Sequence, residues 1–141
     1  MLTIDRRARL SVPSTTEGCL ERLGDVESYP SWASLIKRAE LGGGHVRLEA
    51  EMLGVGLVMD CSLEVGSDRA VLRRVPYSLD DDELYEATWT VSADPAGSLV
   101  ELHVVAAIEV PGPARLVRGR IERRLVDDLL ADFARSFQRS T

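Results

Sequence analysis

Between residues 45 and 110 apolar and polar side chains alternate along much of the chain, and this period of two constrains the fold most. Residues 45–53, 57–65 and 99–110 each carry an apolar side chain at nearly every second position. Such a period is typical of β-strands that bury one side and expose the other. Glycine-containing turns separate neighbouring runs, so we expect consecutive strands to pair antiparallel.

Three further stretches fit the same pattern. Residues 3–12 alternate before Pro13, residues 70–75 form a shorter run, and residues 84–93 follow an acidic loop at 77–83. The sequence therefore predicts a sheet of about six to seven antiparallel strands. Because every strand has one apolar side, helices must cover one side of a single curved sheet.

Helical patterns occupy both flanks of these strands. Ser14 and Glu17 form a capping box that predicts a helix up to Gly24, and Pro30 fits the first turn of a second short helix that begins near Ser28. Residues 114–139 predict one long amphipathic helix. Its apolar stripe recurs every four residues, at Ile121, Leu125, Leu129, Phe133 and Phe137.

Length and composition restrict the class of protein. The 141 residues, 45% hydrophobic and 28% charged, fit one globular domain over 1–141. A net charge of -6 argues against DNA binding driven by bulk electrostatics. No apolar run approaches the roughly 20 residues of a membrane span, and the charged N-terminus does not match a signal peptide. Because the two cysteines form no CxxC pair, we expect a reducing, cytoplasmic location. The sequence leaves open whether the protein forms a homodimer.

Few residues have the pattern of a metal or catalytic site. The two histidines, His45 and His103, lie on different predicted strands without ligand spacing, and no GxSxG motif occurs. Cys61 is the one reactive group on an apolar strand side, where cysteine usually acts as a small hydrophobe. We therefore expect no metal and no cofactor.

Three stretches in chain order resemble one superfamily. They are VPSTTEGCLERLGDVESYPSW at 12–32, ATWTV at 87–91 and IEVPGPARLVRGRIERRLVDDLLADF at 108–133. The chain is similar over essentially its whole length to the START-like or SRPBCC helix-grip superfamily, and within it to the polyketide cyclase/dehydrase and lipid-transport family. The resemblance implies an α+β fold in which a curved antiparallel sheet wraps around a long C-terminal helix, with two short helices after the first strand.

The same resemblance implies a function. A cavity between the sheet and the C-terminal helix would bind or transport a hydrophobic small molecule, such as a lipid, a quinone or an aromatic polyketide. One alternative is a polyketide aromatase/cyclase or dehydratase, a class in which relatives use an arginine and tyrosines. Either Arg73 or Arg74 faces inward here, and the sequence leaves open which one. A second alternative is a ribosome- or protein-interaction module.

The candidate ligand-binding residues follow from the apolar strand sides, the helix stripe and the resemblance. The strands and the stripe supply Leu48, Met52, Met59, Cys61, Tyr85, Trp89, Leu102, Val104, Ile121, Leu125 and Leu129. The resemblance adds Tyr29 and Trp32 at the mouth of the cavity. These two aromatic residues either line that mouth or only pin the helix pair onto the sheet.

Overall fold

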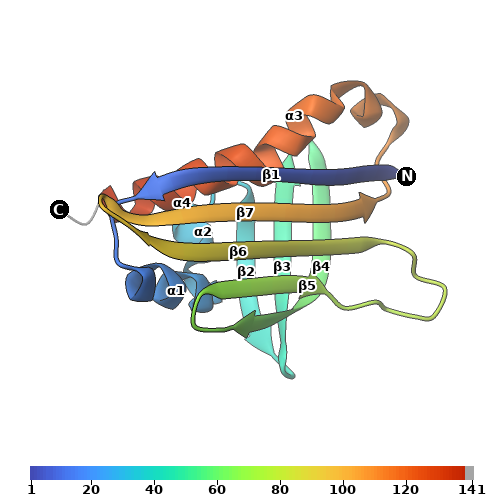
Figure 1. The fold of residues 1–141 in the computed structure, drawn as a ribbon. Coiled ribbons are helices and arrows are strands. Elements are labelled where there is room, and N and C mark those ends of the chain that lie inside the picture. The colour runs from blue at the N-terminus through green and yellow to red at the C-terminus, as the bar shows by residue number, and fades with distance from the viewer. Residues whose placement is uncertain (139–141) are drawn as a thin grey trace.

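Seven antiparallel strands form one curved sheet in the computed structural model, which describes residues 1–138 (Figure 1). The strands are β1 Leu2–Val12, β2 Ile36–Gly42, β3 His45–Met52, β4 Val55–Val65, β5 Arg69–Arg74, β6 Leu84–Asp94 and β7 Gly97–Ile108. Their order across the sheet is β1-β7-β6-β5-β4-β3-β2, so β1 and β2 are the edge strands. The predicted antiparallel sheet of six to seven strands is confirmed.

Helices follow β1 and β7. After β1 come α1 Thr16–Gly24, the 3₁₀ turn η1 Val26–Ser28 and α2 Tyr29–Trp32. After β7 come the 3₁₀ segment η2 Gly112–Val117, α3 Arg118–Arg123, the π-helical turn η3 Arg124–Asp128 and α4 Leu129–Gln138. The sheet curves around this C-terminal helical segment, and α1 and α2 lie at one end of it (Figure 1). The predicted helix-grip fold is therefore confirmed.

The structure corrects the predicted start of the first helix. Thr15, and not Ser14, is the N-cap, and its hydroxyl accepts a hydrogen bond from the backbone N–H of Gly18 at 3.0 Å. The reason is that Ser14 still belongs to the turn that leaves β1, where its N–H donates to the carbonyl of Val12 at 2.8 Å.

The stretch after Pro30 also differs from the prediction. The second helix is a single turn that ends at Trp32, and Ile36–Gly42 forms β2. An edge strand that buries almost nothing has no reason to alternate, and only Ile36 and Ala39 of β2 are partly buried. The alternation that reveals the other strands is therefore missing here.

The C-terminal segment is helical as predicted but is not one uniform α-helix. It begins with a 3₁₀ segment and contains the π-helical turn Arg124–Asp128. The predicted end at residue 139 lies outside the described residues. The apolar stripe nevertheless faces the sheet, since Ile121, Leu125, Leu129 and Phe133 are all buried.

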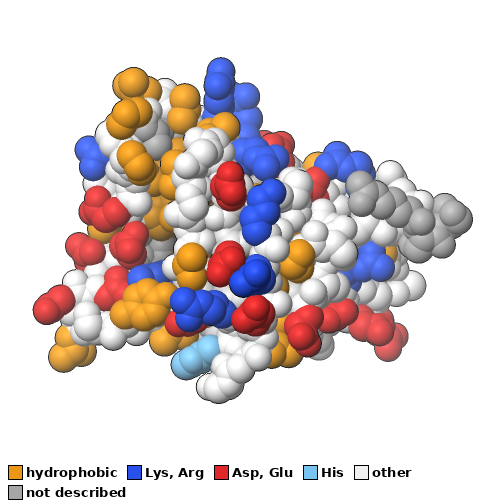
Figure 2. Space-filling view, turned by 180° about the vertical axis from the view of Figure 1, so that it is seen from behind, with side chains coloured by type: hydrophobic (Ala, Val, Ile, Leu, Met, Phe, Trp, Pro, Cys, Tyr) orange, Lys and Arg blue, Asp and Glu red, His pale blue; other side chains and the backbone are white. Residues whose placement is uncertain are grey.

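Exposed large apolar side chains occur both on strands and in connections, and the two most exposed, Leu79 and Leu116, lie outside the strands. Figure 2 shows hydrophobic side chains gathered at the end of the molecule that carries η2 and the loop between β5 and β6, with charges of both signs beside them. Leu79 in that loop and Leu116 in η2 are almost fully exposed, and Leu53 in the β3–β4 turn is about half exposed. This end lies opposite the one covered by α1 and α2.

Candidate functional site

The apolar sides of the strands and the C-terminal helix enclose a small cavity. Its walls come from α2, from strands β2 to β7 and from η3 and α4, and its volume is about 30 Å³. That is about the share of volume that one water molecule takes in the liquid. The cavity as it stands is therefore too small for a lipid or a polyketide.

The structure places eight of the predicted ligand-binding residues on this cavity. They are Tyr29, Trp32, Leu48, Met59, Tyr85, Trp89, Leu125 and Leu129. Five others are buried on the same inner sides without lining it, namely Met52, Cys61, Leu102, Val104 and Ile121. The predicted facing of the strands is thus correct, while the position of the cavity along them was not predictable from alternation.

Seven lining residues were not among the candidate ligand-binding residues: Leu35, Ile36, Ala50, Leu57, Leu72, Ala87 and Ile108. Leu35 and Ile36 were missed because no strand was predicted there, since β2 is an edge strand without alternation. Leu72 and Ala87 are directly paired across β5 and β6, so they share one side of the sheet. Ala87 lies two residues before Trp89, and this spacing is the signal that could have identified both.

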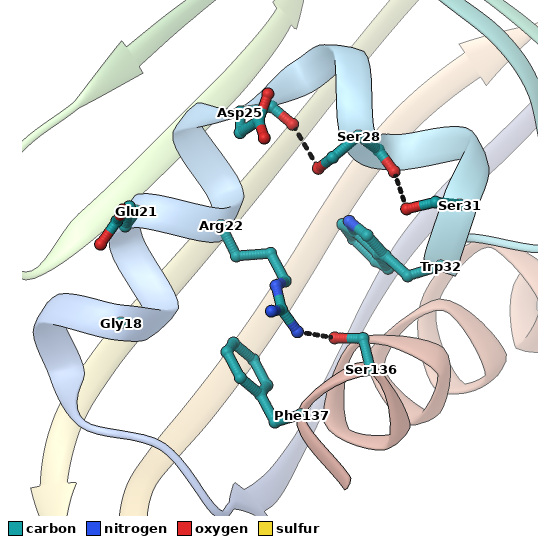
Figure 3. Close-up of a pocket in the computed structure, with 9 residues that line it drawn as sticks. All are labelled: Gly18, Glu21, Arg22, Asp25, Ser28, Ser31, Trp32, Ser136 and Phe137. Carbon is teal, nitrogen blue, oxygen red and sulfur yellow. Dashed lines mark hydrogen bonds between the residues drawn. The ribbon is translucent and has the colours of Figure 1, made fainter. Parts of the chain in front are cut away.

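Trp32 lies between the cavity and the surface. Its ring packs against Tyr29, Phe133 and Trp89 with centroid distances of 5.2, 5.3 and 6.2 Å. Besides the cavity, Trp32 lines two open depressions on the surface, of about 670 and 430 Å³. We call the larger one the outer groove; it is lined by Gly18, Glu21, Arg22, Asp25, Ser28, Ser31, Trp32, Ser136 and Phe137 (Figure 3).

The indole nitrogen of Trp32 is buried, and it has no hydrogen-bond partner among the described residues. The neighbouring Tyr29 hydroxyl, in contrast, donates to the backbone carbonyl of Leu23. A buried donor without an acceptor costs roughly 1–3 kcal/mol. Trp32 is therefore held by packing alone, while Tyr29 is fixed by packing and by a hydrogen bond.

Burial controls the titratable groups in and next to the cavity. Desolvation raises the pKa of Tyr29 and Tyr85 well above that of a free tyrosine, with a smaller contribution from nearby groups. Desolvation, assisted by Asp60, also raises the pKa of the Cys61 thiol to about 12. All three groups are consequently protonated and neutral near pH 7.

The structure decides which arginine faces inward. Arg74 lies opposite Cys61 in the β4–β5 register and is 9% exposed, whereas Arg73 points outward to Glu86 at 2.8 Å. Arg74 turns toward the acidic loop and donates to Asp81 at 2.8 Å and to the carbonyl of Glu83 at 2.7 Å. The hydrogen bond from Arg74 lowers the pKa of Asp81 to about 2. The inward cation is thus neutralised by the chain itself.

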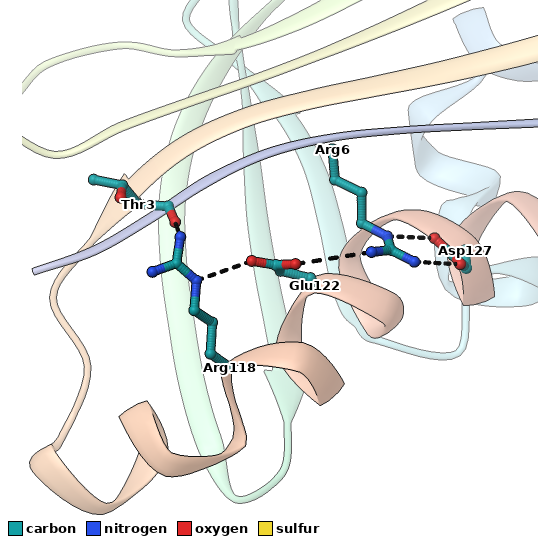
Figure 4. A network of polar contacts seen from close by, with 5 residues as sticks. All are labelled: Thr3, Arg6, Arg118, Glu122 and Asp127. Atoms are coloured by element: carbon teal, nitrogen blue, oxygen red, sulfur yellow. Dashed lines mark hydrogen bonds and ion pairs between the residues drawn. The ribbon is translucent and has the colours of Figure 1, made fainter.

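A polar network anchors the helical side of the cavity to β1 (Figure 4). Arg6 donates two hydrogen bonds to Asp127 in η3, at 2.8 and 2.9 Å, and lies 3.8 Å from Glu122. Arg118 donates to Glu122 at 3.0 Å and to the carbonyl of Thr3. These contacts hold η3 and α3, and with them Leu125, in place against the sheet edge.

Comparisons with known proteins bear on the fold. No family model and no curated protein matches the sequence. Among solved structures, a START superfamily protein from Mycobacterium smegmatis is similar at a TM-score of 0.75 and 16% identity, with 99% of each chain covered. A Streptomyces aromatase/cyclase is similar at 0.70 and 18%, covering 99% of this chain and 97% of its own. A STAR-related lipid transfer protein from Xanthomonas axonopodis is similar at 0.69 and 15%, covering 94% and 84%.

The chain therefore has the START-like helix-grip fold, with a STAR-related lipid transfer protein and an aromatase/cyclase among its structural neighbours. Within residues 1–138, no helix is long and apolar enough to cross a membrane. In the same residues, no group of three or more His, Cys, Asp or Glu side chains could hold a metal ion.

Proposed function

We propose that this protein binds a hydrophobic small molecule between the sheet and the C-terminal helix, and that Trp32 closes this site when no ligand is present. The observation that carries the proposal is the position of Trp32, which walls the apolar cavity on one side and both surface depressions on the other. Movement of this one side chain would join the interior to the outside.

The energetics of opening support such a movement. Turning Trp32 outward breaks no hydrogen bond of its indole N–H, which gains water instead. The loss is mainly the packing against Tyr29, Trp89 and Phe133, where an aromatic pair is worth about 0.5–1.5 kcal/mol. A ligand that covers the same apolar walls recovers roughly 25 cal/mol per Å² of buried surface. The free energy that ligand binding gains can therefore offset the free energy that opening costs.

The walls define the class of ligand. Apart from the hydroxyls of Tyr29 and Tyr85 and the indole N–H groups of Trp32 and Trp89, the lining side chains are apolar. Such a surface favours a molecule with few polar groups, namely a lipid, a quinone or an aromatic polyketide. The neighbours described as a lipid transfer protein and as an aromatase/cyclase support this range.

The structure favours binding over catalysis. A general acid or base needs a pKa near the working pH. Burial instead raises the pKa values of Tyr29, Tyr85 and Cys61 far above neutrality, and Arg74 is occupied by Asp81. An aromatase/cyclase or dehydratase would have to recruit Arg74 by moving the acidic loop away from it.

A second candidate function is an interaction module. The small cavity volume and the exposed side chains of Leu79 in the β5–β6 loop and Leu116 in η2 favour it, at the end where Figure 2 shows hydrophobic side chains gathered. Binding of an apolar dye would then occur at that end, outside the cavity, and mutations at the two places distinguish the two functions.

A fluorescence titration with Nile red, a neutral apolar dye, tests the proposal. We expect one dye per wild-type chain and at least about tenfold tighter binding by Trp32→Ala. The reason is that three lost aromatic contacts are worth more than 1.4 kcal/mol, the free energy of a tenfold change. Trp32→Phe, which retains most of the packing, should bind like the wild type and shows that changes at this position leave the fold intact.

The matched control is Leu79→Ala, which removes an exposed apolar side chain from the opposite end. Its dye affinity should equal that of the wild type. If Leu79→Ala loses the signal while Trp32→Ala leaves the affinity unchanged, the dye binds the exposed end. The interior site is then wrong and the interaction module gains support.

A further inference from the structure

The outer groove contains hydrogen-bond donors that no described residue satisfies. Arg22, on α1, points across the groove and lies 3.9 Å above the ring of Phe137 (Figure 3). Of its five N–H donors, one bond is found within residues 1–138, from Nη1 to the Ser136 hydroxyl at 2.7 Å. No carboxylate of the described residues lies within 4.0 Å of its guanidinium as an ion-pair partner.

Trp32 supplies a second unsatisfied donor at the same groove. Its side chain is more than nine-tenths buried, and its indole N–H has no acceptor among the described residues. Figure 3 shows the nitrogen-bearing edge of the indole turned toward the space between α1 and α2, on the side where Arg22 lies. The small outward rotation of Trp32 that opens the cavity would also expose this N–H to the groove.

Among the described residues, the hydroxyls of Ser28 and Ser31, which line the groove, accept no hydrogen bond from Arg22 or from the indole of Trp32. Ser28 donates its hydroxyl to the carbonyl of Asp25, and Ser31 donates to the carbonyl of Ser28. Glu21 and Asp25 lie at the groove but are solvent-exposed, where water and salt screen their charges. The chemistry missing at the centre of the groove is thus an acceptor, and an anionic one pairs best with a guanidinium.

We propose that the outer groove holds the carboxylate head of an acidic amphiphile, with Arg22 and the indole N–H of Trp32 as its donors. The apolar part of the same molecule continues inward past Trp32, the wall that the groove and the cavity share. This inference rests on the proposed function and narrows its ligand from any apolar molecule to one with a carboxylate at one end.

The two tryptophans of the chain give a direct readout. In NMR spectra of the protein with isotope-labelled tryptophan side chains, each indole N–H yields one signal. The signal of Trp89, which lines the cavity, serves as the internal reference. Dodecanoate and dodecanol are titrated in parallel at a pH where the carboxylate is ionised. We expect dodecanoate to shift the Trp32 signal strongly. We also expect dodecanoate to bind about tenfold tighter than dodecanol, because a hydrogen bond to a charged group contributes a free energy of about that size.

Arg22→Gln should remove this preference by weakening dodecanoate about tenfold while leaving dodecanol unchanged. Arg22→Lys should restore part of it, because the charge returns. Arg9→Gln is the matched control, since it removes the same charge from an exposed position on β1 away from the groove. Its affinities should equal those of the wild type.

The outcomes separate this inference from the proposed function. Equal binding of both probes by the wild type and by Arg22→Gln would overturn the head-group site and leave the apolar cavity intact. A shift of Trp89 alone on adding dodecanoate would overturn it as well. Binding of neither probe, to any variant, would overturn both.

Discussion

Trp32 combines two properties that rarely occur together in a buried residue. It is packed by three aromatic neighbours, yet its one polar atom has no partner in the described part of the chain. Its helix is a single turn, with Pro30 in the first positions. Most buried polar groups in native proteins are satisfied, so an exception calls for an explanation. A side chain that must leave its position for a ligand to enter provides one.

Arg74 shows the opposite behaviour, because a carboxylate and a backbone carbonyl of the chain itself pair with it. Asp81 accepts from Arg74 and also from the backbone N–H groups of Tyr77 and Glu83. Both side chains of the pair are mostly buried, at 6% and 11% exposure. The acidic loop is therefore organised around Arg74, which faces inward while Arg73 points outward.

Asp81→Asn should lower stability in a pH-dependent way. Because the pKa of Asp81 is lowered to about 2, its contribution is fully present above the unfolded-state value of about 4. It is lost as the pH falls from about 4 through about 2. Urea midpoints should thus differ between wild type and Asp81→Asn near neutral pH, and the difference should shrink below pH 4.

Asp82→Asn is the control, because Asp82 is exposed and neighbours Asp81 in the same loop. Its midpoint should follow that of the wild type at every pH. A difference for Asp81→Asn that stays constant down to the acid limit would show that the Arg74 contact does not depend on the charge of Asp81.

At the scale of elements, the spacing of apolar residues in the C-terminal helical segment explains why it contains a π-helical turn. Its apolar stripe recurs every four residues, whereas an α-helix has about 3.6 residues per turn, so the stripe drifts around the helix axis. A π-helical turn holds more residues than an α-helical turn, and η3 therefore takes up part of the drift. Ile121, Leu125, Leu129 and Phe133 all remain buried as a result.

The Arg6–Asp127 contact should stabilise the docking of this segment on β1. A double-mutant cycle with Arg6→Met and Asp127→Asn should give a coupling energy of about 0.5–1 kcal/mol in urea unfolding. The value is near the upper limit for surface pairs because the contact has two parallel hydrogen bonds. It stays modest because both side chains are more than one third exposed.

The Arg7–Glu101 pair on the outer side of the sheet provides the comparison for that cycle. It has one hydrogen bond of 2.9 Å, and Arg7 is 65% exposed. Its coupling energy should be close to zero. Equal coupling in the two cycles would mean that the network in Figure 4 does not hold the helix to β1.

For the whole molecule, the alternation of apolar residues was enough to predict the antiparallel sheet, and the helical stripe was enough to predict its cover. Both signals exist because each element buries one side. β2 buries little, so its sequence carried no such signal. The facing of Arg73 and Arg74 required the β4–β5 register, in which Arg74 lies opposite the inward Cys61.

The site was harder to predict than the fold. Eight lining residues could be predicted because they lie on the inner sides of the strands, on the helix stripe and in α2. The cavity volume could not, because it is the small remainder after all side chains have packed, and no local pattern encodes it. The proposed closing role of Trp32 likewise depends on its contacts with Tyr29, Trp89 and Phe133, which come from three separate parts of the chain.

Native mass spectrometry of the purified protein, before and after extraction with organic solvent, tests the central claim most directly. The account predicts a stoichiometric added mass that extraction removes, and the same binding of one Nile red per extracted chain. The bare mass of the chain in both samples, with no adduct even at saturating dye, would contradict it. The START-like fold would then serve here without an interior ligand.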